Sequence, residues 1–282
     1  MARIVVTGAT GTVGRAVVER ALEDGHEVAA AVRRPDDADL SAEVEAVAFD
    51  FTESSTYGPA LAGADGLFLM RPPAVSDAER YINPVVDAAE RASVGHVAFL
   101  SVLGAERNPL LPHRKTEKRL EASRLGYTLL RASNFMQNLA EQNAADIRER
   151  DLVFVPAGDG RVSYVDARDV GAAAAVALAA AGPKQQALDL TGPEAIDHFE
   201  VARVLSDVLG RRIDYARPGA AEFVRRKLGE GEPLPFVLVM TGIYTVARLG
   251  LADRVTDDLA AALGRSATPF ATFAADYRDA WS

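Results

Sequence analysis

The sequence predicts an α/β protein built on a doubly wound parallel sheet with the strand order 3-2-1-4-5-6. Short apolar segments rich in β-branched residues alternate with segments of helical periodicity along the first 190 residues, and this alternation is typical of β–α–β units. A glycine-rich turn joins the first apolar segment to the first helical one. From residue 219 onward helical patterns dominate, so we expect a small, mainly helical C-terminal region.

Composition excludes several classes of protein. The chain has 282 residues, of which 49% are hydrophobic, and this is enough for one large α/β domain or for a large and a small one. The formal charge of −9 argues against a nucleic-acid partner, since such proteins usually carry a basic face. The absence of cysteine excludes disulfides, Cys-ligated zinc and a thiol nucleophile, and no metal site is predicted.

The pattern of apolar residues also argues against a membrane protein. No apolar stretch reaches the ~20 residues that a membrane-spanning helix needs. The chain enters a predicted strand almost at its first residue, so we expect no signal peptide. These observations favour a soluble, cytoplasmic protein with no membrane partner.

The turn at residues 8–14 has the spacing Gly-x-x-Gly-x-x-Gly between a predicted strand, Arg3–Val6, and a predicted helix, Arg15–Leu22. Gly8 can turn tightly, Gly11 lets a pyrophosphate approach the backbone, and Gly14 lets the helix pack close to the strand. The helix N-terminus would face the phosphates. An ordinary turn with three glycines is the alternative. The predicted cofactor loop comprises Gly8, Thr10, Gly11, Thr12, Val13 and Gly14.

The second predicted strand, Glu27–Val32, ends at Arg33-Arg34. Enzymes that use NAD tend to place an acid here to bind the ribose 2′-hydroxyl. A guanidinium group instead pairs bidentately with a phosphate, so we expect NADP(H) to be preferred over NAD(H). The alternative is a solvated basic pair before Pro35.

Three further strands are predicted at Val44–Phe49, Gly66–Met70 and Gly95–Leu100, with a helix at Asp77–Ala92 before the last of them. Ligands bind at the carboxyl ends of the strands in such sheets. The residues that follow these strands are therefore candidate site residues. Asp50, Phe51, Arg71 and Ser101 are candidates for binding the cofactor, and Pro72 for contacting the substrate.

The next segment carries the candidate chemistry, on a polar helix at Pro112–Ser123 that precedes a sixth strand at Tyr127–Arg131. None of the seven tyrosines has a lysine four residues further on. The Tyr-x-x-x-Lys dyad of ordinary short-chain reductases is therefore missing. His113 stands twelve residues after Ser101, about where that tyrosine would be, and Glu117 lies one turn later on the same helix face.

These motifs resemble the NmrA-like atypical branch of the short-chain dehydrogenase/reductase superfamily. The resemblance begins at Thr7–Gly14 and runs through His113-x-x-x-Glu117 to Asn138, and it continues at Gly160–Val170, Leu190–Glu194 and Val255–Asp258. It implies a Rossmann-type doubly wound parallel sheet with a small, mainly helical C-terminal substrate cap. The branch includes NADPH-dependent quinone oxidoreductases and triphenylmethane reductases, alongside redox-sensing regulators that do no catalysis.

The resemblance also implies roles for individual residues. Asp50 and Phe51 would lie beside the adenine, although an ordinary turn acid is an equal alternative for Asp50. Ser101 and His113 are the candidate catalytic residues. His113 could donate a proton or serve a purely structural role. We favour an acceptor that takes hydride unaided, and expect Glu117 either to keep His113 charged or merely to hold its ring. Asn134, Phe135 and Met136 would border the nicotinamide and the acceptor, or simply pack.

The remainder of the chain mixes short strands with helices. We expect residues 1–150 to form the dinucleotide-binding core, and residues 151–282 to add its final strand and helix and a smaller substrate-binding region. The predicted strands are 151 onward, 161–165, 186–190 and 213–215, and the predicted helices are 167–181, 199–209, 221–228, 235–249, 257–263 and 270–281.

The segment Leu234–Ala247 is apolar nearly all round, so we expect a buried helix. It would form a substrate cap with Phe236 and Met240 toward the substrate, with plain core and a second subunit as alternatives.

The leading functional hypothesis is a reductase that transfers hydride from NADPH to an electrophilic small molecule, namely a quinone, a conjugated enone or an iminium ion. The alternatives are an NADP(H)-sensing regulator without catalysis and a non-redox enzyme that keeps the fold. The aromatic cap favours the enzyme, because a sensor needs no shaped apolar pocket. The acceptor is not identified, and a monomer and a homodimer are both compatible with the sequence.

Overall fold

The computed structural model of the protein describes residues 1–72, 75–179 and 184–282. The chain forms two compact units. The first consists of residues 1–132, 167–190 and 258–265, and the second of residues 133–166, 191–257 and 266–282. A single boundary at residue 150 therefore does not divide the units. The first unit also contains a helix, a strand and a second helix from the C-terminal half of the chain, because that strand pairs with the edge of its sheet.

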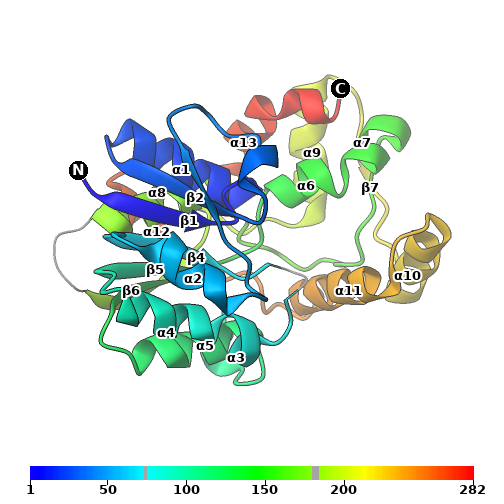
Figure 1. The fold of residues 1–282 in the computed structure, drawn as a ribbon. Coiled ribbons are helices and arrows are strands. Elements are labelled where there is room, and N and C mark those ends of the chain that lie inside the picture. The colour runs from blue at the N-terminus through cyan, green and yellow to red at the C-terminus, as the bar shows by residue number, and fades with distance from the viewer. Residues whose placement is uncertain (73–74, 180–183) are drawn as a thin grey trace. The chain divides into compact units, whose positions relative to one another are not determined.

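The first unit is organised around a seven-stranded parallel sheet with the order β3-β2-β1-β4-β5-β6-β8 (Figure 1). The order expected for a doubly wound fold is confirmed for its first six strands, and β8 adds a seventh beside β6. The strands are β1 (Arg3–Thr7), β2 (Glu27–Val32), β3 (Glu45–Ala48), β4 (Gly66–Met70), β5 (His96–Val102), β6 (Gly126–Ala132) and β8 (Gln185–Leu190).

Helices cover both faces of this sheet, which explains why its central strands are continuous apolar runs rather than alternating ones. In β4 the four residues from Gly66 to Leu69 are all buried. One face carries α1, α8 and α12, and the other carries α2, α4 and α5 (Figure 1). The helices of this unit are α1 (Thr12–Glu23), α2 (Tyr57–Leu61), α3 (Ala78–Tyr81), α4 (Asn83–Arg91), α5 (Pro112–Glu121), α8 (Ala167–Ala179) and α12 (Asp258–Leu263).

Two predictions for the first unit differ from the structure. The helix expected at Asp77–Ala92 is divided at Ile82 into α3 and α4, because Pro84 has no amide hydrogen and its ring clashes with the preceding turn. The short helix α2 was not predicted. The helix expected over residues 167–181 is observed up to Ala179, and its last two residues lie outside the described part of the chain.

The second unit is mainly helical, as expected, and has its own core. That core includes Phe154, Tyr164, Phe270, Phe273 and Trp281. Its elements are α6 (Gln137–Glu141), α7 (Ala144–Arg150), β7 (Leu152–Val153), α9 (His198–Leu209), β9 (Asp214–Tyr215), α10 (Ala220–Gly229), α11 (Leu234–Arg248) and α13 (Phe270–Asp276). Strands β7 and β9 pair in parallel. No strand forms at residues 161–165, where Val162 and Val165 make only isolated bridges.

Helix α11 is not buried all round, and this expectation was wrong. One face, formed by Val237, Met240, Tyr244 and Ala247, is buried. Leu238 and Val239 on the other face keep 56% and 60% of their surface exposed. A helix that is apolar on every face can be buried on any of its faces, but the sequence does not say on how many. In α11 a single face packs against the unit and the others stay exposed. None of the helices in the described residues has the length and apolar character that a membrane crossing requires.

Helices α1 and α8 approach so closely that glycine is required at their contact. A Cβ atom built on Gly171 of α8 would lie 2.5 Å from the Cβ of Ala16 and 2.9 Å from the backbone nitrogen of Val17. Gly242, in the middle of α11, has no atom within 4 Å of such a Cβ. Both glycines lie inside helices, but Gly171 has no room for a side chain and Gly242 has open space around it.

Substitution of these two glycines by alanine should have opposite effects. Gly171→Ala should lower the free energy of unfolding by roughly 1–3 kcal/mol, because the methyl group overpacks the contact of α8 with α1. The control Gly242→Ala should leave it unchanged or raise it by up to about 1 kcal/mol, since alanine favours a helix over glycine. Chemical denaturation followed by circular dichroism measures both, and equal stability of the two variants would contradict the close contact.

Candidate functional site

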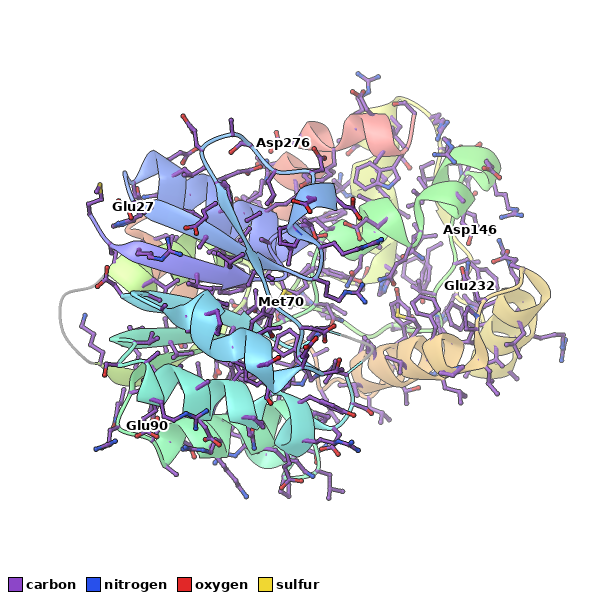
Figure 2. The ribbon with its side chains drawn as sticks, viewed as in Figure 1. Glu27, Met70, Glu90, Asp146, Glu232 and Asp276 are labelled. Carbon is purple, nitrogen blue, oxygen red and sulfur yellow. The ribbon has the colours of Figure 1, made fainter. Side chains whose placement is uncertain are left out.

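The predicted cofactor loop forms a tight turn at the carboxyl end of β1. Gly8 adopts a left-handed conformation with φ 65°. A Cβ atom at Gly8 would lie 2.3 Å from the Sδ of Met70, the methionine labelled in Figure 2. The amide of Gly11 donates a hydrogen bond of 2.9 Å to the carbonyl oxygen of Gly8 and closes the turn. The left-handed backbone conformation requires glycine at position 8, and a side chain there would also displace Met70.

Gly14 and Gly11 of the loop differ in the space around them. A Cβ at Gly14 would lie 2.0 Å from the carbonyl oxygen of Gly8, so only glycine lets α1 pack this close to β1. A Cβ at Gly11 would meet only the same oxygen, at 3.4 Å. Gly11 is exposed, so the fold itself leaves open space at this position. That space is what a ligand close to the backbone would need.

The N-terminus of α1 is suited to an anion. Helix α1 begins directly after Gly11, no side chain caps it there, and its first turn has no acidic residue. Amide hydrogens in the first turn of a helix have no carbonyl partner within the helix, and the helix dipole adds positive potential there. The side chain of Val13 is buried in the fold, so only its backbone could serve a ligand. Thr10 and Thr12 are exposed.

The arginines after β2 are both exposed at the surface of the first unit. Arg34 forms an exposed ion pair with Asp37 at 3.3 Å. Arg33 forms no ion pair with the described residues, and its charge helps to lower the pKa of Asp50. Arg33 therefore lies near the end of β3 with its guanidinium group available to a ligand.

Asp50 and Phe51 have clear structural roles. The Oδ1 atom of Asp50 accepts hydrogen bonds from the backbone nitrogen and the hydroxyl of Thr52, both at 2.7 Å, and these bonds are the main cause of its lowered pKa. Phe51 is buried against Phe49, with the two ring centroids 4.9 Å apart. The turn explains Asp50 without a ligand, and contact of either residue with adenine stays a prediction.

Arg71 organises the loop that follows β4. Its Nη1 atom donates hydrogen bonds to the carbonyl oxygens of Pro72, at 3.1 Å, and Val75, at 2.7 Å. Burial lowers the pKa of Arg71, but a guanidinium group remains charged at neutral pH. Arg71 therefore places a positive charge at the carboxyl edge of the sheet, and Pro72 is half-buried beside it.

Ser101 is tied to a buried carboxylate. Its hydroxyl donates a hydrogen bond of 2.7 Å to Oε1 of Glu117, which is completely buried. The same carboxylate accepts two hydrogen bonds from Arg131, at 2.9 and 3.0 Å, and one from Arg114 at 2.9 Å. Burial alone would raise the pKa of Glu117, but the bonds from Arg131, Ser101 and Arg114 outweigh it and hold the pKa below its usual range. Glu117 is therefore ionised, and Ser101 is oriented by it.

His113 is neutral at physiological pH. Burial, together with the charge of Arg71, lowers its pKa to about 4, and the opposing effect of Glu117 is smaller. Its Nδ1 atom is buried without a partner among the described residues, and its ring lies 6.4 Å from that of Phe99. The expectation that Glu117 keeps His113 charged was wrong, because burial and the charge of Arg71 lower the pKa of His113 more than Glu117 raises it.

The residues after β6 belong to the second unit. Asn134 and Met136 exchange backbone hydrogen bonds of 2.9 Å with Val165, and Phe135 is half-buried. The side chain of Met136 keeps only 1% of its surface exposed, within the core of that unit. Met136 therefore has the packing role that was the alternative, while Asn134 lines a cavity of about 10 Å³.

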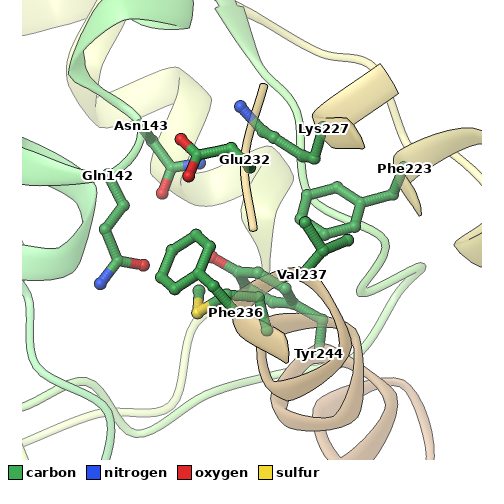
Figure 3. A pocket seen from close by; sticks show the side chains of 9 residues that line it. Gln142, Asn143, Phe223, Lys227, Glu232, Phe236, Val237 and Tyr244 are labelled. Atoms are coloured by element: carbon green, nitrogen blue, oxygen red, sulfur yellow. The ribbon is translucent and has the colours of Figure 1, made fainter. Parts of the chain in front are cut away.

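A larger pocket of about 60 Å³ lies within the second unit and is shown in Figure 3. Phe236 and Met240, both predicted to contact substrate, line it together with Tyr244 of the same helix. Gln142 and Asn143 also line it and were not predicted. Asn143 directly precedes α7, so its position in the sequence is that of an ordinary helix cap and gave no signal of a pocket.

A sequence model of the NAD(P)H-binding family matches residues 8–181 of the chain. The chain belongs to the NAD(P)H-binding family. The matched segment begins at the first glycine of the loop, directly after β1, and includes β2 to β6. The NAD(P)H azoreductase of Xenophilus azovorans is 33% identical to this family member over 277 residues, which cover 96% of each chain.

Solved structures of the family are similar along the whole chain. The triphenylmethane reductase of a Citrobacter species, complexed with NADP(H), matches with a TM-score of 0.87 and 27% identity, covering 98% of this chain and 100% of its own. The NADPH-dependent quinone oxidoreductase QOR2 of Escherichia coli, complexed with NADPH, matches with a TM-score of 0.88 and 25% identity, covering 98% and 99%. The resemblance to the NmrA-like branch is therefore confirmed.

The loop geometry leads to a prediction for Gly11. Gly11→Val should abolish measurable NADPH binding, because the side chain would occupy the open space that a pyrophosphate needs. Isothermal titration calorimetry measures this. The variant should fold, since a Cβ there meets only one backbone oxygen, and circular dichroism checks it. Gly219→Val, at an open position of the second unit, should bind NADPH like the wild type. Normal affinity in folded Gly11→Val would show that the loop does not hold the cofactor.

Proposed function

We propose that this protein is an NADPH-dependent reductase that transfers hydride to an electrophilic small molecule, namely a quinone, a conjugated enone or an iminium ion. The observation that carries the proposal is the glycine loop between β1 and α1. Gly8 is required by its left-handed backbone conformation, Gly14 is required by the close packing of α1, and the space at Gly11 is open. The relatives that match over nearly their full length, an azoreductase and two reductases complexed with NADP(H) or NADPH, support the same class of activity.

When bound, the nicotinamide would supply the hydride. The chain's own residues would do the binding and positioning. The loop and the N-terminus of α1 would hold the pyrophosphate. Arg33, which has no ion-pair partner among the described residues, would hold the 2′-phosphate and favour NADPH over NADH. Ser101, oriented by Glu117, and His113 would border the nicotinamide at the carboxyl edge of the sheet.

The protonation states favour acceptors that need no acid. The sequence has no Tyr-x-x-x-Lys dyad. The hydroxyl proton of Ser101 is directed at Glu117 rather than outward, and His113 is neutral. Quinones, conjugated enones and iminium ions take up hydride readily and can receive any further proton from water. They therefore fit this site better than simple ketones, whose reduction needs a placed acid.

The proposal is tested by NADPH oxidation, followed by its absorbance at about 340 nm, against a panel of quinones, enones and cationic dyes. We expect turnover with at least one electrophile and none with simple ketones. Gly11→Val is the negative control. NADPH binding without turnover of any panel member would reject the reductase and favour an NADP(H)-sensing regulator.

The predicted cofactor preference depends on Arg33. Arg33→Ala should weaken NADPH binding by roughly 1.5–3 kcal/mol, the contribution of a charge-assisted hydrogen bond, and leave NADH binding nearly unchanged. Arg34→Ala is the matched control and should change NADPH affinity less, because Arg34 is paired with Asp37. Titration of both cofactors into each variant measures this, and an equal loss for NADPH and NADH in Arg33→Ala would exclude a 2′-phosphate contact.

His113 should contribute little to the chemical step. His113→Gln should lower kcat by less than about tenfold, because an imidazole with a pKa of about 4 holds almost no proton to donate at pH 7. For the same reason the wild-type kcat should show no step near pH 6.5. A thousand-fold fall in kcat with normal NADPH affinity would instead make His113 the catalytic acid.

A further inference from the structure

The pocket of the second unit combines aromatic walls with a polar end. Phe223 of α10 and Phe236, Met240 and Tyr244 of α11 provide the apolar walls, and Asn143 lies at the opposite side (Figure 3). Phe236 keeps 38% of its surface exposed. Because the cavity itself measures about 60 Å³, a single aromatic ring would enter it only in part and would rest on Phe236 with the remainder.

Asn143 presents an unsatisfied hydrogen-bond acceptor to this pocket. Its side chain is 4% exposed, yet its Oδ1 atom has no partner among the described residues. Asparagine at this position before a helix normally caps the first turn, but the side chain of Asn143 does not cap α7. A buried amide oxygen without a partner costs about 1–3 kcal/mol, and a ligand that donates a hydrogen bond would remove this cost.

Tyr244 adds a donor on the opposite wall. Burial raises the pKa of its hydroxyl, which therefore keeps its proton at neutral pH and can donate it. A ligand group that both donates and accepts would suit Asn143 and Tyr244 together. A phenolic hydroxyl is such a group, and its ring matches the aromatic walls.

The charges around the pocket exclude an anionic ligand. Lys227 lines the pocket, but its Nζ atom already bonds to Asp146, at 3.3 Å, and to Glu230, at 2.9 Å. Glu232 adds an exposed carboxylate to the lining. Lys227 is the one cation among the residues that line the pocket, and its ammonium group is already shared between two carboxylates, so the lining offers a carboxylate or phosphate no unpaired positive charge.

We propose that this pocket binds small neutral phenols, with the phenolic hydroxyl donating to Oδ1 of Asn143 and the ring packed against Phe236 and Met240. Binding here does not require reductase activity or NADPH. The proposal and the proposed function can therefore fail independently.

The test compares phenol with anisole, its methyl ether, which keeps the ring and loses the donor. Binding to the full-length protein without cofactor is measured by protein-observed NMR titration. Phenol should bind saturably and about three- to tenfold more tightly than anisole, the range expected for one hydrogen bond. Asn143→Leu should abolish this difference by weakening phenol binding alone. It should fold with unchanged or higher stability, because it removes an unsatisfied buried polar group.

Asn83→Leu is the matched control. Asn83 also has a buried Oδ1 atom without a partner, but it lies at the start of α4 in the first unit, so this change should leave phenol binding unchanged. Equal affinity for phenol and anisole in the wild type, or unchanged phenol affinity in Asn143→Leu, would overturn the proposal. A marked loss of stability in Asn143→Leu would also overturn it, because the oxygen would then have a structural role.

Discussion

The backbone of helix α1 is confined by two contacts that leave no room for a Cβ atom. On one side Gly14 lies against the carbonyl oxygen of Gly8 at the end of β1, and on the other Gly171 of α8 lies against Ala16 and Val17. These contacts hold the helix axis and its N-terminus at a set distance from the sheet. Since packing density in protein interiors allows little adjustment, the amide groups of the first turn are oriented before any ligand arrives.

A second constraint acts on the same edge of the sheet through charge. Glu117 is buried and ionised because Arg131, Arg114 and Ser101 all donate hydrogen bonds to it. A buried carboxylate is tolerated only when it is paired in this way. With its charge taken up, Glu117 has little influence on His113, and burial with the nearby Arg71 decides the protonation state of the histidine. Neither Glu117 nor His113 therefore offers an acidic proton at this edge of the sheet.

The parts of the fold that depend on local pattern were predictable. Strands β2 and β4 begin and end at the predicted residues, because buried parallel strands are short apolar runs between clear turns. Pro84 indicated a helix break in the sequence, but the apolar residues around it have helical spacing, and the prediction followed the spacing and gave one continuous helix. The exposed side of α11 was not predictable, since periodicity cannot tell which face of an evenly apolar helix finds a partner.

The candidate site was predictable where one segment determines it and not where distant segments meet. The glycine loop is a local motif, in which Gly8 turns with a positive φ and Gly14 lets α1 pack close to β1. The role of Gly11 toward a pyrophosphate stays a prediction. The state of Glu117 depends on Arg131 of another strand, and that of His113 depends on Arg71 from a loop about forty residues earlier. The pocket at Asn143 depends on α10 and α11, about a hundred residues later. The spacing of residues along the chain could not predict these long-range contacts.

Because each unit consists of three separate segments of the chain, a single cut in the chain does not separate the two units. The first unit receives α8, β8 and α12 from the C-terminal half, so any single cut near residue 150 removes the last strand of its sheet and the helix that packs on α1. Such a fragment would expose the edge of β6 and an apolar face of α1, which are surfaces prone to aggregation. The second unit is therefore not a module that a single junction in the chain could exchange.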